Sequence, residues 1–106
     1  MIKIQFLGTS GSVPTEKRGM PAVYLEYSGN RMLFDCGEGT QRQMRIAKLP
    51  FMKLDKIFIS HLHADHCLGL GGLIQTMDLF KRNNKLEIYG PKGIEEVIEK
   101  VITTGH

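Results

Sequence analysis

The segment SHLHADHCLG, residues 60–69, holds four side chains that can bind metal ions: His61, His63, Asp65 and His66. In an extended loop, side chains two residues apart point the same way, so the first two histidines can converge on one ion. Asp65 and His66 then turn towards a second ion. Imidazole and carboxylate ligands suit zinc, with iron or manganese as alternatives. Two ions roughly 3.5–4 Å apart can activate a bridging water for hydrolysis of a phosphoester, an ester or an amide.

Asp65 has a second role in this hypothesis, because a metal-bound carboxylate beside the bridging water can also accept its proton. The alternative interpretation is a solvated loop whose histidines hydrogen-bond to the backbone, as single histidines usually do. Four metal-capable residues directly after an apolar strand pattern and before Gly69 favour the metal site. We therefore predict a dinuclear site in which Asp65 is both ligand and proton acceptor.

The flanking patterns indicate which elements position this loop. They predict strands at 2–7, 21–27, 30–36, 55–60 and 85–90, a hairpin turn at 28–30, and helices at 38–48, 70–80 and 91–103, the last with Pro91 in its first turn. Strands followed by alternating strand and helix indicate an α/β or α+β fold, a mixed sheet with flanking helices. We expect one domain over residues 1–106 with no internal boundary. The loop then follows a strand's carboxyl end, where α/β sheets commonly bind ligands.

The composition favours a small globular protein. The 106 residues are 42% hydrophobic, and no apolar run is long enough to cross a membrane. The first residues form a strand pattern and not a signal sequence, so we expect a soluble, cytoplasmic protein with no membrane partner. Cys36 and Cys67 are too few for a disulfide framework, and we expect both to be reduced. The net charge of +3 permits a polyanionic partner without requiring one.

Three stretches carry a resemblance to a known family: FLGTSGSVPT at 6–15, LFDCGEGTQRQM at 33–44 and SHLHADHCLGLGGL at 60–73. HLHADH matches the HxHxDH signature of the metallo-β-lactamase superfamily, and the three stretches together resemble the ribonuclease Z family within it. The resemblance implies the N-terminal half of an αβ/βα sandwich that binds two zinc ions. It also implies an endoribonuclease that removes the 3′ trailer from precursor tRNA and acts as a homodimer. His61 and His63 correspond to ligands of the first zinc, Asp65 and His66 to ligands of the second, and Asp65 to the proton acceptor.

The sequence also departs from this family. Family members are two to three times longer, and their later segments supply another histidine for each zinc, a bridging aspartate and a tRNA-binding arm. His106 stands at the chain end without the family's flanking pattern and receives no role. We therefore expect weak metal sites, no activity of the chain alone, an apolar sheet surface and self-association. The alternatives are a thioesterase or lactonase of the same superfamily, and a non-catalytic metal-binding module.

Several further features keep two interpretations each. GTSGSVPT is either a phosphate-approaching loop beside the site or a plain turn. Asp35 either braces a metal-binding histidine or caps the following turn. Cys67 is expected to be buried and reduced rather than a ligand. The basic residues that are candidates for RNA phosphate contacts, and otherwise solvated, are Lys17, Arg18, Arg42, Arg45 and Lys48.

Overall fold

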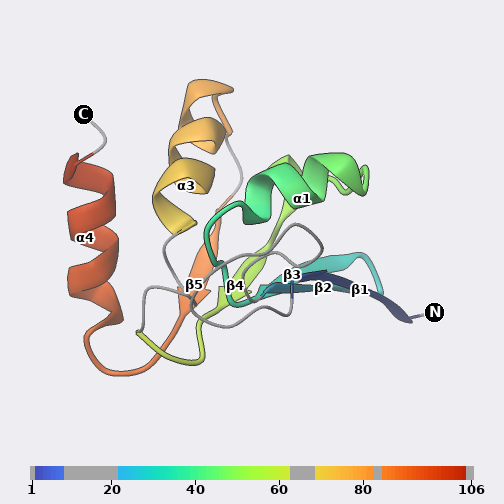
Figure 1. Ribbon diagram of the computed structural model, residues 1–106, viewed down its shortest axis with the longest axis horizontal. Helices are drawn as coiled ribbons and strands as arrows, with labels where there is room; N and C mark the ends of the chain where they lie inside the picture. The colour runs from blue at the N-terminus through green and yellow to red at the C-terminus, as the bar shows by residue number, and fades with distance from the viewer. Residues whose placement is uncertain (1, 9–21, 63–68, 83–84, 105–106) are drawn as a thin grey trace.

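The computed structural model describes residues 2–8, 22–62, 69–82 and 85–104. Within them a five-stranded sheet runs in the order β1-β2-β3-β4-β5, and helices α1 and α3 lie over one side of it (Figure 1). The strands are β1 Ile2–Gly8, β2 Ala22–Tyr27, β3 Asn30–Phe34, β4 Lys56–Phe58 and β5 Glu87–Tyr89. The helices are α1 Thr40–Ile46, the short 3₁₀ helix η1 Phe51–Lys53, α3 Leu70–Leu79 and α4 Ile94–Thr104.

The sheet is mixed, because its first three strands pair antiparallel and its last three pair parallel. The β2–β3 hairpin closes through Ser28 and Gly29, both with positive φ (52° and 80°), as the twist of a two-residue turn requires. Each parallel pair needs a crossover, and α1 and α3 lie in the two crossover connections. The carboxyl ends of β3, β4 and β5 therefore meet at one edge of the sheet.

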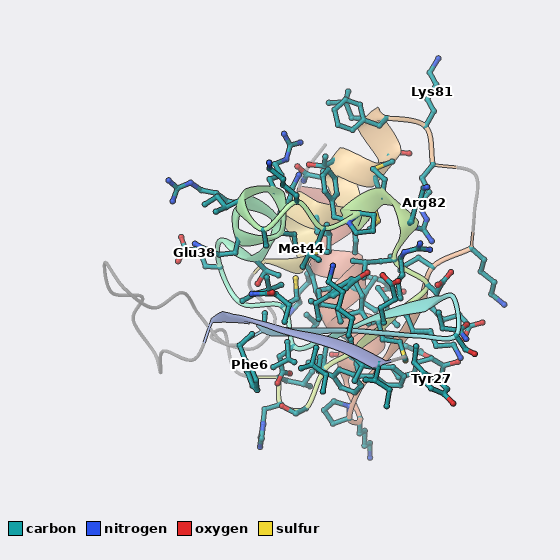
Figure 2. All side chains as sticks on the ribbon, turned by 90° about the vertical axis from the view of Figure 1, so that its right-hand side faces the viewer. Phe6, Tyr27, Glu38, Met44, Lys81 and Arg82 are labelled. Atoms are coloured by element: carbon teal, nitrogen blue, oxygen red, sulfur yellow. The ribbon has the colours of Figure 1, made fainter. Side chains whose placement is uncertain are left out.

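The core lies between the sheet and the helices. Tyr24, Leu33 and Ile57 are neighbours on adjacent strands, and all three side chains are fully buried. They form one core with Met44 of α1 and Leu73 of α3. Figure 2 shows Met44 on the helix side of the sheet, with Phe6 and Tyr27 pointing away on the other side. The described helices thus bury one face of the sheet.

The structure confirms the predicted α/β fold class, with a mixed sheet and flanking helices. The prediction for Pro91 is wrong, because α4 begins only at Ile94. Gly93 has φ +99°, which is not helical, so the chain turns there and the Ile94 amide donates to the Pro91 carbonyl oxygen. The η1 turn was not predicted. Among the described residues no helix is long and apolar enough to cross a membrane.

Candidate metal-binding site

The structure describes one of the four predicted metal ligands. His61 follows β4 and is exposed, whereas His63, Asp65 and His66 lie outside the described residues, as do Cys67, Lys17 and Arg18. Among the residues that the structure does describe, no group of three or more His, Cys, Asp or Glu side chains is placed to hold a metal ion. The two ends of the histidine loop, residues 60–62 and residue 69, are described, and they show how the loop is held.

Asp35 holds the start of the loop. It follows β3 directly, and the parallel register pairs Phe34 with Phe58, so Asp35 lies beside the residues that follow β4. Its carboxylate accepts hydrogen bonds from the Ser60 amide at 2.7 Å and from the Ser60 hydroxyl at 2.8 Å. Its own amide donates to the Phe58 carbonyl oxygen at 2.7 Å. Asp35 adopts φ +64°, a conformation that aspartate tolerates better than most residues. The hydrogen bonds of its backbone amide and of its carboxylate hold it in this conformation.

Ser60 connects this carboxylate to the first histidine. The Ser60 hydroxyl oxygen lies 3.0 Å from His61 Nδ1 as well as within reach of Asp35. A hydroxyl carries one hydrogen, and an ionised carboxylate can only accept, so that hydrogen goes to Asp35. The Ser60 oxygen is then the acceptor for a hydrogen on His61 Nδ1. In this tautomer the lone pair is on Nε2, which is one of the two imidazole nitrogens that can bind a metal ion.

Gly69 holds the end of the loop against the same turn. Its amide donates to the Cys36 carbonyl oxygen at 2.8 Å. A Cβ atom built on Gly69 would lie 2.2 Å from the Gly37 carbonyl oxygen and 3.0 Å from that of Cys36, so this approach has no room for a side chain. Both ends of the histidine loop therefore rest on residues 35–37, although they are nine positions apart in the sequence.

The turn that supports the loop is itself fixed. The Cys36 side chain is fully buried. The Thr40 hydroxyl, at the start of α1, donates to the Gly37 carbonyl oxygen at 2.7 Å, and Thr40 is 2% exposed. Gly39 precedes the helix with φ +83°, a conformation that glycine adopts without strain. The turn is therefore partly buried and held by hydrogen bonds, and such a fixed turn suits the support of metal-binding residues.

The structure decides part of what the sequence left open. Asp35 acts on the histidine loop through Ser60, which favours the bracing role over capping of the following turn. Sequence reasoning missed Ser60 and Gly69. Ser60 directly precedes the first histidine, and that position was the available signal for it. Of the predicted basic contacts, Arg42, Arg45 and Lys48 are exposed on or just after α1, and the Arg45 guanidinium lies 5.0 Å from the centre of the Phe51 ring.

The chain is similar to known proteins over almost its whole length. A sequence profile of the family described as anti-Pycsar protein Apyc1 matches residues 2–105. The chain belongs to this family. It is also 58% identical over 92 residues to ribonuclease Z from Archaeoglobus fulgidus, a match that covers 87% of this chain and 30% of that protein. The expected resemblance to ribonuclease Z is thereby confirmed.

Solved structures show the same fold. The crystal structure of the short form of human tRNase Z superposes with a TM-score of 0.89 at 43% identity, covering all of this chain and 40% of that one. The metallo-beta-lactamase fold protein YhfI from Bacillus subtilis superposes with a TM-score of 0.79 at 25% identity, covering 93% of this chain and 42% of that one. The chain spans about a third of the length of the curated relatives it matches, with coverages of their sequences from 30% to 35%.

Proposed function

We propose that this chain provides metal ligands for an endoribonuclease of the ribonuclease Z type, which hydrolyses a phosphodiester bond and removes the 3′ trailer from precursor tRNA. The observation that carries the proposal is the contact chain from Asp35 through Ser60 to His61, which supports His61 as a metal ligand that would bind through Nε2. The similarity to ribonuclease Z of Archaeoglobus fulgidus and to human tRNase Z supports the choice of substrate.

The donor set fits zinc. His61 and His63 are proposed as ligands of one ion, and Asp65 and His66 as ligands of a second, with imidazole and carboxylate donors that zinc accepts. Bound in a pair, zinc ions would lower the pKa of a water and neutralise the charge on the phosphodiester oxygens. Asp65 would take the proton from that water. Asp35 and Ser60 would keep the His61 ring in one orientation and one tautomer throughout.

The proposal extends to partners and ligand number. Two protein ligands for each ion are fewer than the three of a usual catalytic zinc site, so further ligands are needed for full activity. We propose a homodimer that binds precursor tRNA in the cytoplasm, with the exposed Arg42, Arg45 and Lys48 among the residues that contact RNA phosphates. These basic contacts bind without reading base sequence, so they would serve any tRNA.

A chimera tests the proposed activity. The 92-residue segment that matches Archaeoglobus fulgidus ribonuclease Z would replace the corresponding segment of that protein, and the chimera would be assayed on a precursor tRNA and on a thioester. We expect RNA cleavage, and we expect His63→Ala and Asp65→Ala each to abolish it. Glu38→Gln, at an exposed position outside the contact chain, is the control and should cleave normally. Thioester turnover without RNA cleavage would contradict the proposal and favour the thioesterase alternative.

A zinc titration of the 106-residue chain tests the ligands without an activity assay. Ser60→Ala removes the hydroxyl between Asp35 and His61, and it should weaken zinc binding roughly 10- to 100-fold, the usual effect of losing a group that orients a ligand. Glu38→Gln again serves as the control. Equal zinc affinity of wild type and Ser60→Ala would show that His61 is not held for metal binding in the way we propose.

A further inference from the structure

The turn between β5 and α4 begins at the same edge of the sheet as the histidine loop. β4 and β5 are parallel neighbours, with Phe58 opposite Tyr89 (Figure 1). The Ile59 amide extends this pairing by one bond, because it donates to the Tyr89 carbonyl oxygen at 2.8 Å. Two parallel strands end at one edge, so residues that follow β4 can meet residues that follow β5. We call residues 90–94 the β5–α4 turn.

Leu62 of the histidine loop contacts the β5–α4 turn. A Cβ atom built on Gly93 would lie 3.0 Å from Leu62 Cδ1, so the leucine methyl group covers the glycine where a side chain would begin. Leu62 is partly buried, whereas the preceding His61 is exposed. The contact therefore removes an apolar side chain from water and leaves the histidine accessible.

The β5–α4 turn is a fixed surface for this contact. Gly93 adopts φ +99°, a conformation open to glycine, and its carbonyl oxygen accepts from the Val97 amide at 3.3 Å. Ile94 folds back over Gly90, where a built Cβ atom would lie 2.9 Å from Ile94 Cγ1. Ile94 and Val97 also pack against the buried core between the sheet and the helices. A side chain that rests on this turn is therefore connected to the core of the fold.

Leu62 stands between His61 and His63 in the sequence, and these are the two proposed ligands of the first ion. We propose that Leu62 is a positioning residue that anchors the histidine loop to the β5–α4 turn and thereby sets the direction in which both histidines present their rings. In an extended loop, neighbouring side chains point to opposite sides. A leucine held against the turn therefore directs the histidines on either side of it away from the turn.

The anchor completes the support of His61. The Ser60 amide donates to the Asp35 carboxylate at 2.7 Å, which holds the loop one residue before the histidine, and Leu62 holds it one residue after. Contacts on both sides restrict the His61 backbone, and a ligand that is fixed in advance loses less conformational freedom when a metal ion binds. The inference rests on the proposed function and adds to it a residue that binds no metal itself.

A pair of matched leucine variants tests the proposal. Leu62→Ala and Leu86→Ala remove the same atoms from partly buried side chains, but Leu86 precedes β5, at the opposite end of that strand from the turn. Both variants should lower the midpoint of urea unfolding. Only Leu62→Ala should weaken zinc binding by the 106-residue chain, roughly tenfold, as does the loss of other groups that orient a ligand. Leu62→Met, which keeps an apolar side chain of similar volume, should bind zinc nearly as the wild type does.

Two results of this comparison would overturn the role of Leu62. One is equal zinc affinity of wild type and Leu62→Ala. The other is an equal loss of zinc affinity in both alanine variants, because Leu62 would then act only through the stability of the fold.

A pair of glycine variants approaches the same contact from the turn and leaves Leu62 in place. The methyl group of Gly93→Ala would lie 3.0 Å from Leu62 Cδ1, whereas that of Gly29→Ala, at φ +80°, meets nothing within 4 Å. Both variants place a side chain at a positive φ, so both should be less stable than wild type. Zinc affinity should fall in Gly93→Ala alone, because only its methyl group displaces Leu62. Equal zinc affinities of the two glycine variants would contradict the anchor.

A measurement without metal separates the anchor from the proposed function. In the zinc-free chain, the heteronuclear Overhauser effect of the His61 amide reports its motion on the picosecond to nanosecond timescale. It should fall in Leu62→Ala and keep its wild-type value in Leu86→Ala, and an unchanged value in Leu62→Ala would overturn the anchor. A wild-type chain that binds no zinc would overturn the proposed function and the positioning role together. Zinc binding that is lost in His63→Ala but unaffected in Leu62→Ala would overturn the role of Leu62 alone.

Discussion

Replacement of Gly69 by alanine is expected to destabilise the support of the histidine loop. Gly69 has φ −79°, which alanine adopts without backbone strain, so the penalty arises from the close approach alone. The new Cβ would lie 2.2 Å from the Gly37 carbonyl oxygen, where real Cβ contacts essentially never fall below 3.0 Å. The obstructing atom is backbone and cannot rotate away. The two segments must separate, at a cost of ~1–3 kcal/mol for overpacking.

Separation also strains the hydrogen bond from the Gly69 amide to the Cys36 carbonyl oxygen, which contributes ~1 kcal/mol. Alanine gains ~0.4–1 kcal/mol by restricting the unfolded chain, so the net loss should be ~1–3 kcal/mol. Gly72→Ala, three residues further on, is the matched control. Its Cβ would meet nothing closer than Gln41 Oε1 at 3.9 Å, and as an interior helix position it should gain ~0.5–1 kcal/mol.

Urea unfolding of the two glycine variants measures this difference directly. Gly69→Ala should lower the midpoint and Gly72→Ala should raise it, with the slope of the transition unchanged if both remain two-state. Zinc binding should fall in Gly69→Ala alone, because only that substitution moves an end of the histidine loop. If Gly69→Ala proves as stable as the wild type, the loop end is not packed against residues 36–37 and the reasoning fails.

Two other substitutions test the groups around this site and the core. Thr40→Val removes the hydroxyl that donates to the Gly37 carbonyl oxygen and should cost ~1 kcal/mol in urea unfolding; no loss would show that this hydrogen bond does not hold the turn. Burial, and then the neighbouring Glu26 carboxylate, raise the pKa of Tyr24 above its ordinary value of 10.0. The neutral Tyr24 hydroxyl therefore contributes stability that is fully present below pH 10 and is lost as the pH rises through the raised pKa. Tyr24→Phe should lose less of its free energy of unfolding between neutral and alkaline pH than the wild type does. Equal losses in the two proteins would contradict this.

Much of the local structure could be predicted from the sequence, because its causes are local. Alternating apolar residues predict β1, and the Ser28–Gly29 pair closes the hairpin with positive φ at both residues, which Gly29 adopts without strain. Helix ends were predicted less well. The helix predicted at 38–48 is shorter in the structure, where α1 spans Thr40–Ile46. Gly39 and Lys48 both have positive φ, so the helix cannot continue through either residue. The four ligand candidates follow from residue types and spacing alone, and the ligand role of all four stays a prediction.

Tertiary structure alone decided which distant residues support the two ends of the histidine loop. Asp35 and Ser60 are 25 positions apart, and they meet only because the parallel register sets Phe34 against Phe58 at the shared end of β3 and β4. Gly69 needs to be glycine because a carbonyl oxygen from residue 37 occupies the space of its side chain. Which face of the sheet is exposed likewise depends on the side that the helices cover. Sequence periodicity fixes which residues share a face of a strand, but a sheet has two faces, and the packing of α1 and α3 selects the one that is buried.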